Sequence, residues 1–171
     1  IYSPPRVTNI ANKIGLTPAF AFNLTTVDPV DGKAWDFNDP IKRERALNTV
    51  KQEKPFLLVG SPPCRAFNQL FMSNVSRMDP KAVKEIVREG MVHLMFCVEL
   101  YKIQLQGGRY FLHEHPWGAW SWRVPAMTAL MATPGVSRGK GHMCQFGMYL
   151  DTPEGRQLAL KATGWLTNSP Y

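Results

Sequence analysis

Residues 55–64, PFLLVGSPPC, are the stretch on which the prediction of the fold depends. The apolar run from Pro55 to Val59 is short and ends at turn-forming residues, which predicts a buried strand. Gly60-Ser61-Pro62-Pro63 predicts a stiff turn, because each proline fixes its own backbone φ angle. Cys64 comes directly after this turn, at the start of a predicted helix.

Two longer helices lie on either side of this stretch. Asp39-Pro40 opens a helix that runs to about Lys54, and Asp79-Pro80 opens a longer one that ends at Gly107-Gly108. In both, an aspartate can cap the first turn and a proline occupies the first helical position. A second apolar strand, RYFLH over residues 109–113, follows the longer helix.

Shorter elements complete the pattern of alternating strands and helices. Helices are predicted at residues 8–14, after Cys64 and at 124–131, and strands at 18–24, 34–37, near Met143 and near Trp165. This alternation predicts an α/β fold with a largely parallel sheet. The chain has no internal repeat and no flexible hinge, so residues 1–171 are expected to form one domain.

Composition excludes several classes of protein. Of the 171 residues, 44% are hydrophobic, which argues against disorder, and no apolar run approaches the roughly 20 residues of a membrane-spanning helix. Twenty Lys and Arg residues against thirteen Asp and Glu residues give a net charge of +7. Such a charge favours an anionic partner, with nucleic acid ahead of an acidic membrane surface.

The three cysteines, Cys64, Cys97 and Cys144, are odd in number and form no CxxC pattern. This usage predicts a reducing, intracellular compartment rather than a secreted disulfide framework. The sequence begins at Ile1 and stops at Tyr171 without a capping element, and we expect it to be part of a longer polypeptide.

Two predicted strand ends carry residues that are suited to chemistry. Cys64 follows the first strand, and Glu114 follows the second within His113-Glu114-His115-Pro116. In open α/β sheets, ligands bind at the carboxyl ends of the strands. A cysteine at a helix start, followed by Arg65, lies where a thiolate is favoured. The structural alternative is a small buried cysteine that packs a strand–helix junction.

The turn Ser61-Pro62-Pro63-Cys64, followed by Phe67, resembles the Pro-Pro-Cys motif of DNA cytosine-5 methyltransferases. At the next strand end that family has Glu-Asn-Val; Glu114 matches its glutamate, and His115-Pro116 replaces Asn-Val. The resemblance follows the order of elements over roughly residues 1–146. It implies a Rossmann-like, three-layer methyltransferase domain.

Several whole phrases also look like the methyltransferase-like segments found in polyproteins of mobile elements. They are Ser3-Pro4-Pro5-Arg6-Val7, Trp35-Asp36-Phe37, residues 60–64, residues 111–116 and Leu166-Thr167-Asn168-Ser169. A mobile-element origin is therefore expected.

The resemblance implies methylation of cytosine in DNA at carbon 5, with S-adenosylmethionine as the methyl donor. Cys64 would attack C6 of a flipped cytosine, and a protonated Glu114 would stabilise the charge that develops at N3. A soft sulfur nucleophile suits this poor electrophile. Removing the base from a duplex costs a few kcal/mol, and less in single-stranded or mismatched DNA.

The same resemblance assigns residues to the cofactor and base sites. Asp36 lies where the family has an acidic residue near the cofactor's adenine. Asn23, or alternatively Asp28, lies where an acidic residue bonds the ribose. Ser61 and Pro63 are expected to shape the base and cofactor sites.

Two departures from the family bear on cofactor and nucleic-acid binding. Ser3-Pro4-Pro5 stands where the family has a Gly-rich turn, and prolines supply no amide hydrogen. The later Gln-x-Arg-x-Arg motif is replaced by Cys144-Gln145-Phe146-Gly147. We expect Arg65, Arg138 and Lys140 to contact nucleic acid; a solvated basic loop is the alternative for the last two.

Three other functions stay open. An amino methyltransferase would use Ser61-Pro62-Pro63 to hold an exocyclic amino group, although Cys64 cannot stack on a base as that family's aromatic residue does. A non-catalytic module would keep the fold and bind nucleic acid only. A cysteine hydrolase would pair Cys64 with His113 or His115. No third ligand follows this HxH pair at a useful spacing, so no metal site is predicted.

Overall fold

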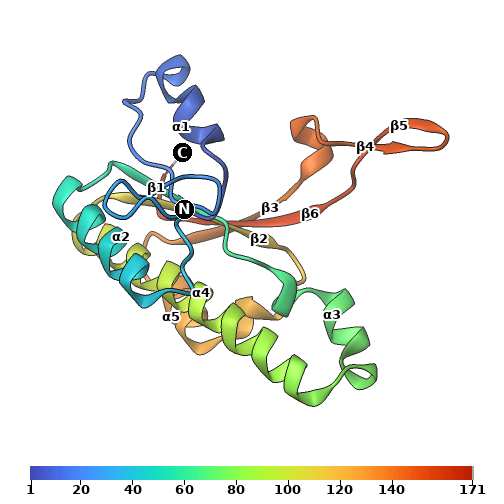
Figure 1. The fold of residues 1–171 in the computed structure, drawn as a ribbon. Helices are drawn as coiled ribbons and strands as arrows, with labels where there is room; N and C mark the ends of the chain where they lie inside the picture. The colour runs from blue at the N-terminus through green and yellow to red at the C-terminus, as the bar shows by residue number, and fades with distance from the viewer. Residues whose placement is uncertain (171) are drawn as a thin grey trace.

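A four-stranded sheet forms the centre of the computed structural model, which describes residues 1–170 (Figure 1). The strand order is β1-β2-β6-β3, with bounds Leu57–Gly60, Tyr110–Pro116, Ala162–Thr167 and Ser137–His142. β1 and β2 pair in parallel, whereas β6 pairs antiparallel with both β2 and β3. The prediction of an α/β fold is confirmed. The prediction of a largely parallel sheet is wrong, because the sheet is mixed.

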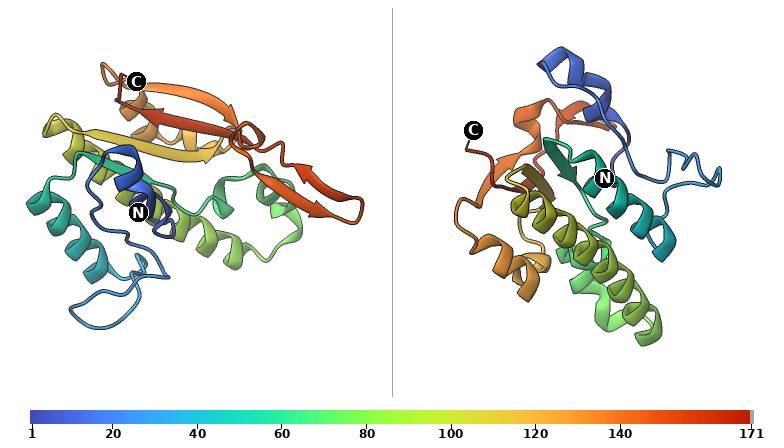
Figure 2. Two further views of the ribbon diagram at one scale, coloured as in Figure 1. Left: turned by 90° about the horizontal axis from the view of Figure 1, so that it is seen from above. Right: turned by 90° about the vertical axis from the view of Figure 1, so that its left-hand side faces the viewer.

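One reversed strand explains the mixed sheet. β3 and β6 are joined by the short helix η5 (Met143–Phe146) and a hairpin of β4 (Tyr149–Thr152) and β5 (Gly155–Leu158), without a crossover helix. Such a connection returns the chain antiparallel to the strand it left. β1, β2 and β3 therefore run in one direction, and β6 runs between β2 and β3 in the other. The hairpin projects away from the rest of the molecule (Figures 1 and 2).

The backbone of the first residues extends the sheet beyond β1. The amide of Ser61 donates to the carbonyl of Ile1, the Ile1 nitrogen donates to the Val59 carbonyl, and the Tyr2 amide donates to the carbonyl of Phe22. The segments predicted as strands at 18–24 and 34–37 contain no regular strand; only an isolated bridge joins Val27 to Ala34. The backbone hydrogen bonds of these two segments are too few to form a regular β-strand pairing.

The two long helices match their predictions closely. α2 spans Pro40–Glu53 after the Asp39 cap, and α4 spans Pro80–Gln106 after the Asp79 cap; each cap accepts a backbone hydrogen bond. The shorter helices are α1 (Arg6–Ile10), η1 (Ala11–Ile14), η2 (Arg65–Phe67), α3 (Gln69–Asn74), η3 (Val75–Arg77), η4 (Trp120–Arg123) and α5 (Pro125–Met131). None of the helices in residues 1–170 is long and apolar enough to cross a membrane.

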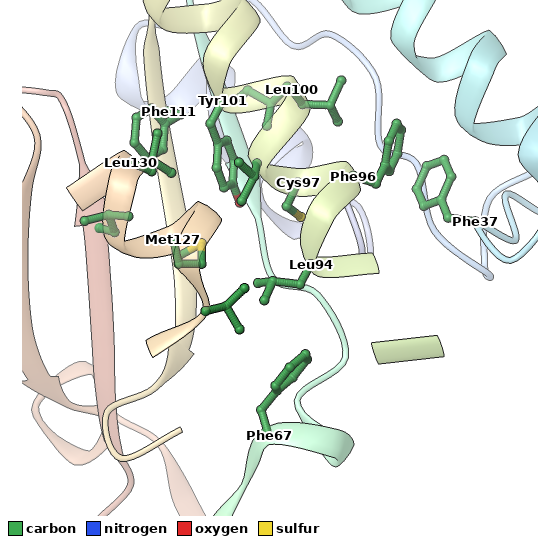
Figure 3. Packing of buried hydrophobic residues seen from close by; sticks show 14 of the residues in the cluster. Phe37, Phe67, Leu94, Phe96, Cys97, Leu100, Tyr101, Phe111, Met127 and Leu130 are labelled. Atoms are coloured by element: carbon green, nitrogen blue, oxygen red, sulfur yellow. The ribbon is translucent and has the colours of Figure 1, made fainter. Parts of the chain in front are cut away.

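The main core lies on one face of the sheet, where α2, α4 and α5 gather, whereas α1 lies on the other face (Figures 1 and 2). Figure 3 shows side chains of α4 packed between β2 and α5. The fully buried members include Leu94, Cys97, Leu100, Tyr101, Phe111, Met127 and Leu130. The buried residues of β2 alternate along the strand, so every second side chain points away from α4.

Candidate functional site

The parallel pair brings the two predicted catalytic segments to the same edge of the sheet. Gly60, the last residue of β1, is the register partner of His113 in β2. The turn that carries Cys64 and the end of β2 therefore leave the sheet side by side. β2 runs three residues further than predicted, so Glu114 lies within the strand rather than after it.

Glu114 faces away from α4. Its neighbours His113 and His115 are fully buried on the α4 face, and alternation along β2 places the Glu114 side chain on the opposite face. Its Oε1 atom is buried without a hydrogen-bond partner in residues 1–170, and the Nζ of Lys161 is 3.6 Å away. A buried oxygen without a hydrogen-bond partner is unusual in a folded protein. Lys161 could not be found from sequence, because its approach depends on the β2–β6 pairing.

Cys64 is partly exposed and precedes η2. Two aromatic contacts hold this helix in place: Trp120 Nε1 donates to the carbonyl of Ala66 at 2.8 Å, and Phe67 packs on Trp120 with centroids 4.7 Å apart. Gly90 of α4 permits the close approach of η2, because a Cβ there would lie 2.6 Å from the Cβ of Ala66. No hydrogen bond or ion pair in the described chain joins Cys64 to Glu114.

The two histidines of β2 are buried and neutral near pH 7. Burial lowers the pKa of His115 to about 4 against the opposing effect of the Pro63 and Pro62 carbonyls, and burial also lowers the pKa of His113 well below its usual range. His115 Nδ1 lies 2.6 Å from the Ser121 hydroxyl, which can donate to it. The residues that the structure describes contain no group of three His, Cys, Asp or Glu side chains that could hold a metal ion.

A cavity of about 370 Å³ lies at the carboxyl edge of the sheet and brings four of the predicted residues together. Asn23, Asp36, Pro63 and Arg65 all line it. Cys64, Ser61 and Glu114 do not; Ser61 is instead tied to Ile1 through its amide. A volume in this range is typical of a small-molecule site.

Asn23 and Asp36 differ in how free their side chains are. Asn23 is buried; its Nδ2 donates to the Ser3 carbonyl, and its Oδ1 accepts from both the amide and the hydroxyl of Thr25. Asp36 is exposed and accepts the Asn38 amide through Oδ1 alone. Asn23 therefore shapes the wall, and Asp36 has an oxygen that is free to accept from a ligand.

Sequence reasoning missed Tyr2, Glu89 and His93, which also line the cavity. The Tyr2 hydroxyl lies 3.1 Å from His93 Nδ1, and Tyr2 has a left-handed φ of 65°. Burial raises the pKa of Tyr2 and lowers the pKa of His93, while Asp36 and Glu89 act to raise the latter. A left-handed φ is strained in a non-glycine residue and is often found at functional sites.

Asp28, the alternative to Asn23, lies outside this cavity. Its side chain is 1% exposed and pairs with Lys42 and Arg45, each at 2.7 Å. Asp31 pairs with the same two basic residues. The expectation that Asp28 contacts the ribose is therefore wrong, since its carboxylate is used to fix the loop before α2.

Arg138 and Lys140 lie on β3, outside the cavity. The Arg138 guanidinium stacks between Trp117 and Trp122, 3.9 and 4.0 Å from the ring centroids, and donates to the Trp117 carbonyl. Burial lowers its pKa. Lys140 is exposed, with its Nζ 5.7 Å from the centre of the Trp117 ring. Lys140 is thus the freer of the two to meet a phosphate.

Comparison of the chain with protein-family models, with curated proteins and with solved structures gave no match.

Proposed function

We propose that this domain is a Rossmann-like methyltransferase that transfers a methyl group from S-adenosylmethionine to carbon 5 of cytosine in DNA. The observation that carries the proposal is the parallel β1–β2 pair, which brings the turn that carries Cys64 beside the last residues of β2, where Glu114 lies. Ligands of α/β sheets bind at this edge. Glu114 Oε1 has no hydrogen-bond partner in residues 1–170, although Lys161 Nζ lies 3.6 Å away, and this unused acceptor supports a role in holding a base.

The cavity fits part of the proposed cofactor. Asp36 offers a carboxylate oxygen that can accept from a nucleoside, and Leu24, Phe37 and Ile86 offer apolar wall. Pro4 lies where an amide donor would be expected and has none. The cavity lining therefore matches the adenosine end of S-adenosylmethionine better than its amino-acid end. When bound, the cofactor supplies an electrophilic methyl group.

Cys64 and Glu114 would act on the cytosine ring. The Cys64 thiolate forms a bond to C6, and the electrons of the C5–C6 double bond shift through the ring toward N3. Glu114 delivers its proton to N3 and so neutralises the charge that develops there. This makes C5 nucleophilic, so that C5 gains the methyl group. Loss of the C5 proton to solvent then supplies the electron pair that re-forms the C5–C6 double bond and expels Cys64 as a thiolate. N3 returns its proton to Glu114, which restores both side chains.

Covalent trapping tests this mechanism. DNA that contains 5-fluorocytosine cannot lose the C5 substituent as a proton, so the enzyme should stay attached to it when S-adenosylmethionine is present. We expect an adduct that survives denaturation with the natural protein and with Cys144→Ser, whose cysteine is also partly exposed, and none with Cys64→Ser. Single-stranded and duplex DNA should both be tried, because base flipping favours the former. An adduct that persists in Cys64→Ser would refute the mechanism.

A non-catalytic nucleic-acid-binding module is the second candidate. The net charge of +7 and the proline loop favour it. It predicts DNA or RNA binding that weakens steeply with salt, together with no thermal shift on addition of S-adenosylmethionine. The cysteine hydrolase is less well supported, because His113 and His115 are fully buried on the α4 face.

A further inference from the structure

The loop of residues 3–6, which borders the cavity next to Cys64, offers few backbone hydrogen-bond donors to a ligand. Pro4 and Pro5 carry no amide hydrogen, and the amide of Arg6 donates to the Pro4 carbonyl. The Ser3 carbonyl is taken by Asn23. The loop that usually cradles the amino-acid end of such a cofactor therefore has no amide to offer from residues 4–6.

Two charged side chains line the same cavity from a different side. Arg65 belongs to η2 and Glu89 to α4, and neither makes an ion pair within residues 1–170. Their chain neighbours, Ala66 and Gly90, are in close contact, since a Cβ on Gly90 would lie 2.6 Å from that of Ala66. Arg65 and Glu89 therefore flank a close contact between η2 and α4.

An arginine and a glutamate that share a cavity without pairing match a ligand with both charges. We propose that Arg65 and Glu89 bind a zwitterionic α-amino acid group, with Arg65 taking its carboxylate and Glu89 its ammonium. Arginine is well suited to a carboxylate because its N–H groups can bond both oxygens, and charge-assisted hydrogen bonds are the strong ones. This inference rests on the proposed function, where the amino-acid group is that of the methyl donor.

Asp36 and Glu89 then have separate roles in the cavity. Asp36 lies on the segment with Phe37 and Asn38, away from the η2–α4 contact in sequence, and remains available to the nucleoside. Side chains of α4 and η2 would replace the missing backbone donors. Arg65 would thus serve the cofactor rather than nucleic acid, which differs from the expectation drawn from sequence.

Calorimetric titration with two nucleosides tests the inference without requiring turnover. S-adenosylhomocysteine carries the amino acid group, whereas 5′-methylthioadenosine has the same nucleoside and thioether without it. We expect the natural protein to bind the former at least tenfold more tightly. Arg65→Met and Glu89→Gln should each weaken S-adenosylhomocysteine binding about tenfold and leave 5′-methylthioadenosine binding unchanged.

Matched controls come from exposed residues outside the cavity. Arg77→Met on η3 and Glu99→Gln on α4 should bind both nucleosides as the natural protein does. If Arg65→Met and Glu89→Gln also do so, or lose both nucleosides equally while still folded by circular dichroism, the inference is wrong and the proposed function stands. If the natural protein binds neither nucleoside, the cofactor site itself is refuted.

Discussion

The rings of His115 and Phe67 lie edge to face with centroids 5.4 Å apart, and they join the end of β2 to the helix that follows Cys64. His115 also contacts Trp122 and bonds to Ser121. The segment after Glu114 therefore supports the segment that carries Cys64. A substitution at His115 should therefore change the reactivity of the Cys64 thiol, although no hydrogen bond joins the two residues.

Replacing His115 by alanine should destabilise the protein by about 2–4 kcal/mol, because it leaves a cavity in a packed aromatic cluster. Ser121→Ala removes only the hydroxyl and should cost about 1 kcal/mol. Urea unfolding followed by circular dichroism measures both. The rate at which iodoacetamide alkylates Cys64 should change in His115→Ala, and an unchanged rate would show that His115 does not position the turn.

Acid should destabilise the fold through the buried histidines. The pKa of His115 falls from 6.5 in the unfolded chain to about 4 in the folded protein, so the unfolded state binds more protons between these values. The contribution of His115 to the free energy of unfolding is then fully present above pH 6.5. It is lost as the pH falls toward 4, which lowers stability by up to about 3 kcal/mol. Unfolding free energies at pH 7 and pH 5 should differ less in His115→Gln, which does not titrate. An equal pH dependence in both proteins would count against this account.

Gly90→Ala should separate η2 from α4. The added methyl meets the Cβ of Ala66, which is fixed to backbone, so we expect a loss of about 1–3 kcal/mol despite the better helix propensity of alanine. Gly139→Ala is the control, since its Cβ would meet nothing within 4 Å. Denaturant unfolding provides the free energies. Equal stability of the two variants would disprove the close contact.

Lys140 and Arg138 should respond differently to substitution. Lys140→Ala should weaken DNA binding and reduce the slope of log affinity against log salt by about one. Arg138→Lys should instead lower stability, because a lysine cannot stack between Trp117 and Trp122 as a planar guanidinium does. Fluorescence anisotropy with labelled DNA and thermal unfolding separate these effects. A larger loss of DNA affinity in Arg138→Lys than in Lys140→Ala would reverse the assignment.

Local signals explain which elements could be predicted from sequence. Asp39-Pro40 and Asp79-Pro80 place the starts of α2 and α4 correctly, because a cap and a proline act within one turn. The reversal of β6 could not be predicted, since strand direction depends on which distant strand it joins. The helix predicted after Cys64 is broken into η2 and α3, and Phe71 is the buried residue of α3.

The candidate site was predictable only in part for similar reasons. Asn23, Asp36 and Pro63 were assigned by resemblance, and the structure places all three in one cavity. Glu89 and His93 lie within the long helix predicted from Asp79-Pro80 to Gly107-Gly108, and their four-residue spacing puts two polar groups on one face within an apolar stripe. This interruption of the apolar stripe is the sequence feature from which Glu89 and His93 could have been predicted as site residues.

The arrangement of helices on one face of the sheet has a consequence for how this protein can change. Phe111 and His113 of β2 pack on Tyr101 of α4, and His115 packs on Phe67, whereas Glu114 points from the same strand to the other side. Substitutions at Glu114 or Lys161 are therefore expected to leave the packed face of the sheet intact. The residue that we propose to hold the base and the residues that pack the core thus lie on opposite faces of one strand, so mutation can change one face while the other is preserved.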